Sequence, residues 1–177
     1  MKKKQNISII GLGNIGTYFY KYLISNKKIL FNKTGALPNV VYISAKSKHK
    51  RRGFSIPKKK WINNYLDVTK KKDVDTIVEL IGGAEGPAKK LVFSALKNKK
   101  NVITANKALV AKYGDQLAKI AEKNRVNFEF EAAVCGGMPI IKSIKEGLIA
   151  NRIHKIYGVL NGTSNYILSL MDKKNID

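Results

Sequence analysis

The chain has 177 residues, a hydrophobic content of 44% and a formal net charge of +22 at pH 7. This length holds one ordinary domain, or one domain and the start of a second, and the hydrophobic content suits a packed core. The composition therefore excludes a disordered tail. No apolar run approaches the ~20 residues of a membrane helix, and the N-terminus lacks a secretory signal, so we expect a cytoplasmic protein.

The charge and the cysteine content limit the chemistry further. Cys135 is the only cysteine, which excludes an intrachain disulfide framework and a multi-cysteine zinc site. The positive charge admits two interpretations: a polyanionic partner such as nucleic acid, or a general bias toward lysine. One part of the charge is local, because residues 17–66 contain no Asp or Glu while five cations crowd into seven positions. These cations are Lys46, Lys48, Lys50, Arg51 and Arg52.

Short apolar runs alternate with helical patterns along the first 130 residues. We expect strands at residues 7–10, 40–43, 76–81, 101–104 and 126–130, and helices at residues 15–24, 87–95 and 115–123. Residues 46–64 are polar and basic, and we interpret them as a loop with at most one short helix. The alternation predicts an α/β fold of the Rossmann type, a doubly wound parallel sheet with helices on both faces.

A glycine motif follows the first predicted strand. The run Gly11-Leu12-Gly13-Asn14-Ile15-Gly16 has the Gly-x-Gly-x-x-Gly spacing of dinucleotide-binding turns. The first glycine permits a sharp turn, the second lets the backbone approach the pyrophosphate, and the third allows close helix packing. The free N–H groups of the helix then face the phosphates. We predict cofactor contacts from five residues of this turn: Gly11, Gly13, Asn14, Ile15 and Gly16.

The second predicted strand indicates which dinucleotide is bound. NAD sites place a carboxylate at the end of this strand for the ribose 2′-hydroxyl, whereas NADP sites place cations there. This strand ends at Ser44-Ala45-Lys46, and the next carboxylate is Asp67. NADP(H) is therefore the preferred cofactor, with NAD(H) as the alternative, and Lys46 is the first candidate for the 2′-phosphate. The alternative for the basic segment is a solvated lysine-rich surface.

Four motifs occur in order in the rest of the chain. They are VELIGG at residues 78–83, TANKAL at 104–109, FEAAVCGGMPII at 130–141 and GVLNGTSNYIL at 158–168. Together they closely resemble homoserine dehydrogenase over nearly the whole chain. The resemblance implies NADP(H)-dependent interconversion of aspartate 4-semialdehyde and L-homoserine, on the route to threonine, isoleucine and methionine.

The resemblance also implies site residues. Hydride transfer to an aldehyde builds negative charge on its oxygen, so a cation or proton donor must lie within reach. Lys107 matches the lysine of the family's Thr-Ala-Asn-Lys motif, and we expect it to be catalytic or to contact the nicotinamide. Gly82 and Thr104, both at strand ends, should line the cofactor groove. The alternative for Lys107 is one more surface lysine.

A monovalent cation, Na⁺ or K⁺, is a further implication of the resemblance. The positions that match the family's cation site are Glu131, Val134, Gly136 and Met138. A carboxylate and carbonyl oxygens suit such a hard cation. The alternative is that Glu131 pairs with a lysine and the glycines only turn the chain into the next helix.

We expect two domains, a cofactor-binding domain at residues 1–138 and, at residues 139–177, the start of an α+β substrate and dimerisation domain. For the second part the patterns predict a helix at 139–148, a strand at 153–160 and a helix at 163–171. Complete members of the family continue beyond this length and are expected to be homodimers or homotetramers. We therefore expect an incomplete form whose own turnover is in doubt. The alternatives are a cofactor-binding fragment without turnover and a polyanion-binding module that uses residues 46–60 with Tyr42, Phe54 and Trp61.

Overall fold

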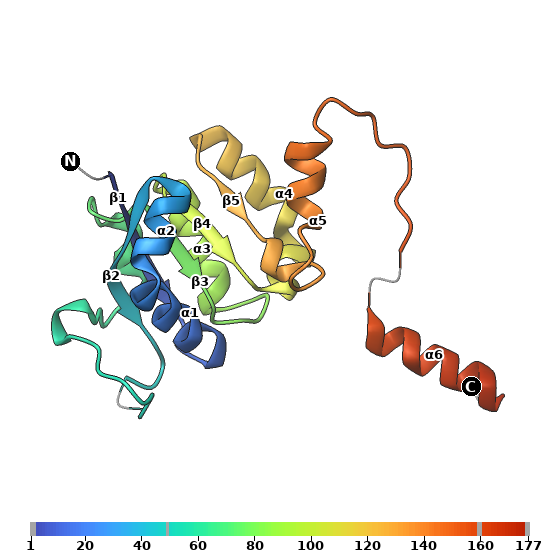
Figure 1. The fold of residues 1–177 in the computed structure, drawn as a ribbon, viewed down its shortest axis with the longest axis horizontal. Coiled ribbons are helices and arrows are strands. Elements are labelled where there is room, and N and C mark those ends of the chain that lie inside the picture. The colour runs from blue at the N-terminus through green and yellow to red at the C-terminus, as the bar shows by residue number, and fades with distance from the viewer. Residues whose placement is uncertain (1–2, 49, 159–160, 176–177) are drawn as a thin grey trace.

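The computed structural model describes residues 3–48, 50–158 and 161–175, and its centre is a parallel β-sheet (Figure 1). The strands are β1 (Lys3–Ile10), β2 (Ala36–Ser44), β3 (Thr76–Glu79), β4 (Asn101–Thr104) and β5 (Phe128–Glu129). Their order in the sheet is β2-β1-β3-β4-β5, and each neighbouring pair is parallel. The chain winds outward from β1 in both directions. The switch point of the sheet therefore lies between β1 and β3, where open α/β sheets bind ligands.

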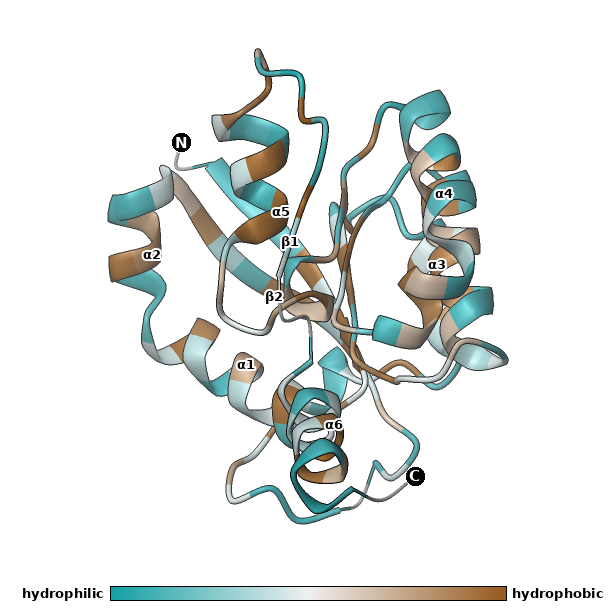
Figure 2. Cartoon of the chain, turned by 90° about the vertical axis from the view of Figure 1, so that its right-hand side faces the viewer, coloured by the Kyte–Doolittle hydropathy of each residue, from teal (hydrophilic) through white to brown (hydrophobic). Residues whose placement is uncertain are grey.

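Helices cover both faces of this sheet. In the described residues the α-helices are α1 (Asn14–Ser25), α2 (Lys27–Thr34), α3 (Pro87–Lys97), α4 (Lys107–Asn124), α5 (Ile140–Lys142) and α6 (Gly162–Lys174). Figure 2 shows α1 and α2 on one side of the sheet and α3 and α4 on the other. Four short segments complete the structure: the 3₁₀ helices η1 (Lys58–Lys60), η2 (Tyr65–Lys70) and η3 (Glu131–Ala133), and a π-helical segment, η4 (Ser143–Gly147). The predicted doubly wound fold is confirmed.

Side-chain alternation along the strands divides the core into two clusters. Ile7 and Ile9 of β1 pack with Leu23 of α1 on one face, whereas Ile10 joins Leu91 of α3 on the other. All four residues of β3 are buried, as expected for a central parallel strand covered on both sides. The carboxyl ends of β1, β3 and β4 consequently meet at one buried edge.

Several element boundaries differ from the prediction. Helix α2 is not among the predicted helices; it has no buried residue, and its C-cap is Gly35, which adopts φ +68°. Helix α4 begins at Lys107, eight residues earlier than expected, because the Asn106 side chain accepts a hydrogen bond from Leu109 N and caps it. Strand β3 ends at Glu79 rather than at residue 81, and β5 keeps only two of its five predicted residues.

The predicted strand at 153–160 is wrong over residues 153–158, which have no regular secondary structure, and residues 159–160 lie outside the described residues. A strand requires a neighbour for its hydrogen bonds, and none is paired with this segment within the described chain. Helix α6 follows and stands apart from the sheet (Figure 1), with none of its described residues buried. Within the described ranges, no helix is long and apolar enough to cross a membrane.

Candidate functional site

The turn between β1 and α1, residues 11–16, is built so that glycine is required at two positions. Gly11 has φ +106°, and a Cβ there would lie 2.3 Å from the carbonyl oxygen of Leu80. A Cβ on Gly16 would lie 2.0 Å from the carbonyl oxygen of Gly11. At Gly13, by contrast, a Cβ would meet no atom within 4 Å. Packing explains Gly11 and Gly16, whereas Gly13 faces open space.

The first turn of α1 has features that favour an anion. Its N-cap is Gly13, which has no side chain to cap the helix, and no acidic residue lies in the first turn. The N–H groups at a helix start have no intrahelical acceptor and carry part of the positive end of the helix dipole. Asn14 and Ile15 are exposed there. The structure therefore brings the predicted turn residues together at the start of α1, and a phosphate bound there stays a prediction.

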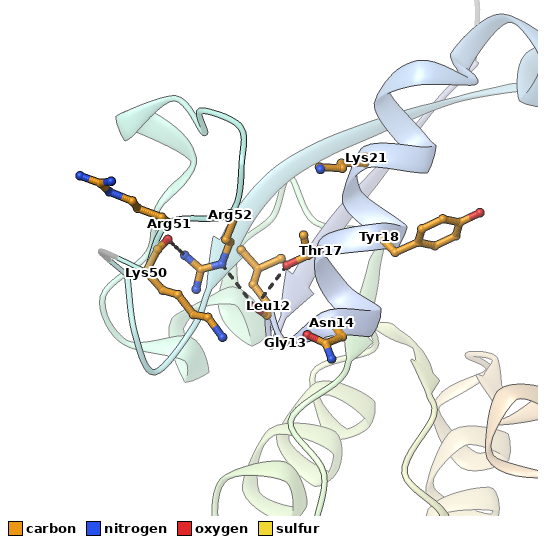
Figure 3. Close-up of a pocket in the computed structure, with 9 residues that line it drawn as sticks. All are labelled: Leu12, Gly13, Asn14, Thr17, Tyr18, Lys21, Lys50, Arg51 and Arg52. Carbon is orange, nitrogen blue, oxygen red and sulfur yellow. Dashed lines mark hydrogen bonds between the residues drawn. The ribbon is translucent and has the colours of Figure 1, made fainter.

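A basic pocket of about 430 Å³ opens beside this turn (Figure 3). Lys21 and Thr17 of α1 form one wall, and the opposite wall comes from the basic loop, which we define as residues 46–52. The lining residues are Leu12, Gly13, Asn14, Thr17, Tyr18, Lys21, Lys50, Arg51 and Arg52. No Asp or Glu occurs among these described residues, so the pocket presents uncompensated positive charge to an anionic ligand.

Arg52 fixes the basic loop to the glycine turn. Its Nε donates to the Leu12 carbonyl at 3.3 Å (Figure 3). Its terminal nitrogens donate to three loop carbonyls. These acceptors are Ser47 O at 2.7 Å, Lys50 O at 2.8 Å and Lys48 O at 3.3 Å. The guanidinium also lies 5.7 Å from the centre of the Trp61 ring. In the sequence, Arg52 is one of a cluster of cations. The structure shows that its donors hold the basic loop to the glycine turn.

A second hollow of about 770 Å³ adjoins the basic pocket and shares Leu12, Gly13, Lys50 and Arg52 with it. It runs over the ends of β1, β2 and β3, where Gly11 N donates to Ser44 O at 2.9 Å. Lys46 is exposed and lines this hollow. The structure thus brings Lys46 to the same groove as the glycine turn. As in the basic pocket, the described lining includes no carboxylate.

A third hollow of about 190 Å³ lies at the ends of β3 and β4. Its lining residues are Ile15, Glu79, Leu80, Ile81, Gly82, Ala105 and Asn106. Gly82 therefore lies in the wall, as predicted from its strand-end position. Thr104 lies underneath: it is fully buried, and its hydroxyl donates to Glu79 Oε2 and accepts from Asn106 N. A direct contact between Thr104 and a cofactor stays a prediction. In the structure its hydroxyl joins the ends of β3 and β4 through hydrogen bonds.

Lys107 is the first residue of α4 and follows Asn106 directly at the rim of this third hollow. The side chain is exposed, and its ammonium has no hydrogen-bond or ion-pair partner within the part of the chain that the structure describes. Its backbone is fixed by the N-cap of α4. A free cation on a fixed backbone can approach a developing oxyanion, and its catalytic role stays a prediction.

An ion cluster joins the β3–α3 loop to α4. Glu85 accepts hydrogen bonds from Lys89, Lys112 and the Tyr113 hydroxyl, with Lys112 Nζ 2.7 Å away. The hydrogen bonds from Lys112, Tyr113 and Lys89 lower the pKa of Glu85 from 4.5 to about 2. All these groups are exposed or half-buried, so the cluster positions the loop more than it adds stability.

The predicted cation ligands lie close together in the chain, from Glu131 at the start of η3 to Met138 just before α5. The Glu131 carboxylate accepts from Ile141 N at 3.0 Å and Lys142 N at 2.8 Å, which caps α5. Its partners are therefore backbone groups and not the lysine side chain of the alternative interpretation. Val134, Gly136 and Met138 follow on a tight turn in which Gly136 has φ +62°. A cation at Glu131, Val134, Gly136 and Met138 stays a prediction.

A doubly wound parallel sheet with a glycine turn at its switch point defines a dinucleotide-binding domain. Comparison with known protein families agrees: residues 11–131 match the model for the homoserine dehydrogenase NAD binding domain, and residues 139–177 match the model for homoserine dehydrogenase. The chain belongs to the homoserine dehydrogenase family.

Individual relatives give the same result. The chain is 42% identical to the homoserine dehydrogenase of Neisseria gonorrhoeae, over 97% of this chain and 39% of that protein. It is 37% identical to the Bacillus subtilis enzyme over 97% of this chain and 40% of that protein. A crystal structure of a homoserine dehydrogenase from Thiobacillus denitrificans superposes with a TM-score of 0.82, at 41% identity, over 97% of this chain and 39% of that one. The chain therefore spans about 40% of the length of these relatives.

Proposed function

We propose that this chain is the NADPH-binding part of a homoserine dehydrogenase. The observation that carries the proposal is the groove around the glycine turn, which joins an uncapped helix start to several cations and no carboxylate. A pyrophosphate fits the helix start, and a 2′-phosphate fits the cations at the end of β2. An NAD-specific site would have an Asp or Glu at that strand end instead.

Each part of the groove has a distinct task in this proposal. Gly13 and the N–H groups of Asn14 and Ile15 hold the pyrophosphate, and Lys46 with Lys50 neutralises the 2′-phosphate. Arg52 keeps the basic loop against the glycine turn without using its donors on the ligand. The nicotinamide end extends to the third hollow, because a dinucleotide crosses the switch point from β2 toward β4.

The proposed reaction is the reduction of aspartate 4-semialdehyde to homoserine and its reverse. When bound, the nicotinamide supplies the hydride, two electrons and one hydrogen nucleus, that the aldehyde carbon accepts, and one proton from the site or solvent completes the alcohol. Lys107 stabilises the negative charge that develops on the aldehyde oxygen. The boundary between the two family matches, at residues 131–139, supports a cofactor-binding domain at 1–138 and the start of a substrate domain at 139–177.

Nucleotide titration of the 177-residue chain tests the proposal. NADPH should bind more tightly than NADH, and 2′,5′-ADP more tightly than 5′-ADP, because only the first member of each pair carries the 2′-phosphate. Equal affinity within each pair would refute the NADPH assignment. Failure of all four to bind, together with salt-sensitive binding of single-stranded DNA, would favour the polyanion-binding module.

The structure gives the polyanion-binding alternative little support. Its three stacking candidates are engaged inside the chain. Phe54 stacks on Tyr20 with ring centres 5.3 Å apart, and the Tyr42 hydroxyl donates to Asp73. Lys48 and Arg52 lie over Trp61. We also propose a cytoplasmic location, because the single Cys135 suits a reducing compartment.

A further inference from the structure

Glu79 is a fully buried carboxylate at the carboxyl end of β3. Burial of a carboxylate is unfavourable unless hydrogen bonds compensate it. Within the described residues no lysine, arginine or histidine nitrogen forms an ion pair with Glu79. Three hydrogen-bond donors face the carboxylate instead: Ile81 N at 2.7 Å and Gly82 N at 3.0 Å on Oε1, and the Thr104 hydroxyl on Oε2. The carboxylate is thus held by two backbone N–H groups and one hydroxyl, all from outside its own strand.

The two carboxylate oxygens hold two different walls of the third hollow. Oε1 holds the turn that follows β3, in which Gly82 and Gly83 have φ +87° and +81°. Oε2 holds Thr104 at the end of β4, and the same hydroxyl accepts from Asn106 N at 3.0 Å. The Thr104 hydroxyl therefore accepts from Asn106 N and donates its own proton to Glu79 Oε2.

Asn106 links the turn after β3 to the start of α4. Its Nδ2 donates to the carbonyl of Gly83 at 2.7 Å, and its Oδ1 caps α4 through Leu109 N. The turn after β3, the end of β4 and the start of α4 therefore form one hydrogen-bonded unit around Glu79, and Lys107 is the next residue on it. Glycines with positive φ are flexible when free, so this turn depends on such a unit for a single conformation.

We propose that Glu79 is a positioning residue that locks the Gly82 turn and the Asn106–Lys107 junction into the wall against which the nicotinamide half of the cofactor binds. This role rests on the proposed function. The lock lies at the β4 side of the switch point, whereas Lys46, Lys50 and Arg52 lie at the β2 side. Loss of the lock should therefore weaken a ligand that has a nicotinamide half and leave one that lacks it unaffected.

The test uses four variants of the 177-residue chain, with NADPH and 2′,5′-ADP as probes. Glu79→Gln keeps the shape and one acceptor oxygen but replaces the other oxygen by an amide donor, so the side chain no longer accepts from Ile81 N, Gly82 N and the Thr104 hydroxyl together. Thr104→Val removes the hydroxyl with little change in volume. Thr104→Ser keeps the hydroxyl. The matched control is Thr69→Val, because Thr69 is also fully buried and bonds Ser94 Oγ at 2.9 Å, but lines none of the three hollows.

Glu79→Gln and Thr104→Val should each weaken NADPH binding about tenfold and change 2′,5′-ADP binding less than twofold, as expected from the loss of one or two buried hydrogen bonds. Thr104→Ser should bind NADPH as the wild type does. Thr69→Val should lower the melting temperature without changing the affinity for NADPH relative to that for 2′,5′-ADP. Equal losses for both ligands in Thr104→Val would overturn the proposal. Thr104→Val serves this purpose even where Glu79→Gln does not fold.

Amide hydrogen exchange supplies a readout that needs no ligand. In Glu79→Gln at least one of the Ile81, Gly82 and Asn106 amides should exchange about tenfold faster, according to which wall keeps the remaining acceptor oxygen, and in Thr104→Val the Asn106 amide should do so, while amides in α1 keep their rates. If the wild-type chain binds neither nucleotide, the proposed function fails, and exchange alone decides on the lock. Unchanged exchange at Ile81, Gly82 and Asn106 in Glu79→Gln would refute it.

Discussion

Alanine substitutions at Gly13 and Gly16 separate the two reasons for glycine in the turn. A methyl group at Gly13 meets no protein atom within 4 Å, and the backbone there, with φ −72° and ψ −158°, accepts alanine. Alanine is a poorer N-cap than glycine by about 0.5–1 kcal/mol. The lower entropy of the unfolded chain offsets about 0.4–1 kcal/mol of this. Gly13→Ala should therefore change the melting temperature by less than about 3 °C.

Although Gly13→Ala should change stability little, it should weaken NADPH binding clearly. If the pyrophosphate approaches the Gly13 backbone, the methyl group fills that space, and overpacking costs about 1–3 kcal/mol. At about 1.4 kcal/mol per factor of ten, this corresponds to NADPH binding that is about 5- to 150-fold weaker. Gly147→Ala is the control, because a Cβ there also meets nothing within 4 Å and the residue lies far along the chain in η4.

Gly16→Ala should instead damage the fold. Its Cβ would lie 2.0 Å from the Gly11 carbonyl oxygen, so the backbone of the turn must move. We expect a loss of about 3 kcal/mol, which lowers the melting temperature of a chain this size by about 6–12 °C. Thermal unfolding and fluorescence titration with NADPH measure both effects. Wild-type affinity in a folded Gly13→Ala variant would refute the proposed position of the phosphates.

Three further predictions concern the cations and the ion cluster. Lys46→Glu should weaken NADPH about tenfold and NADH less than threefold, measured by titration, because only NADPH has the 2′-phosphate; equal losses would move that phosphate elsewhere. Arg52→Lys keeps the charge, but a lysine cannot donate to the same four carbonyls at once. It should lower the preference for NADPH over NADH about fivefold and speed proteolysis of the basic loop. An unchanged rate of proteolysis would contradict the tethering role of Arg52. Because the pKa of Glu85 is lowered to about 2, its contribution to stability is present above about pH 4.5 and is lost as the pH falls toward 2. The difference in melting temperature between the wild type and Glu85→Gln should therefore shrink over that range, and a constant difference would argue against the cluster.

The sequence predicted the order of the central elements because their causes are local. Apolar β-branched runs that end in glycine indicate buried parallel strands, and the spacing of the glycine turn specifies a strand–turn–helix unit. The early start of α4 was missed, although Asn106 is a good N-cap residue, because the helical pattern is clearer after Gly114. The predicted strand was wrong over residues 153–158 because an apolar run becomes a strand only with a partner, and sequence alone does not reveal the partner.

The site was predicted less completely than the fold. Gly11, Gly13, Gly16, Lys46 and Gly82 lie where the motif and strand ends placed them. The roles of Arg52 and Glu79 depend on contacts between segments that are distant in sequence, 40 residues for Arg52 and Leu12 and 25 for Glu79 and Thr104. One signal for Glu79 was present, since it is the single carboxylate inside an otherwise apolar strand run. For Arg52, only the geometry separates it from the adjacent cations.

The anion site that we propose at the glycine turn consists of main-chain atoms, and this affects how the site tolerates mutation. Asn14 and Ile15 are exposed, and the groups offered to a phosphate at these positions are backbone N–H groups. Replacement of either side chain by another helix-compatible residue leaves those groups in place. The information for phosphate binding is therefore concentrated in three glycines, while the surrounding surface is free to accumulate lysines without loss of the site.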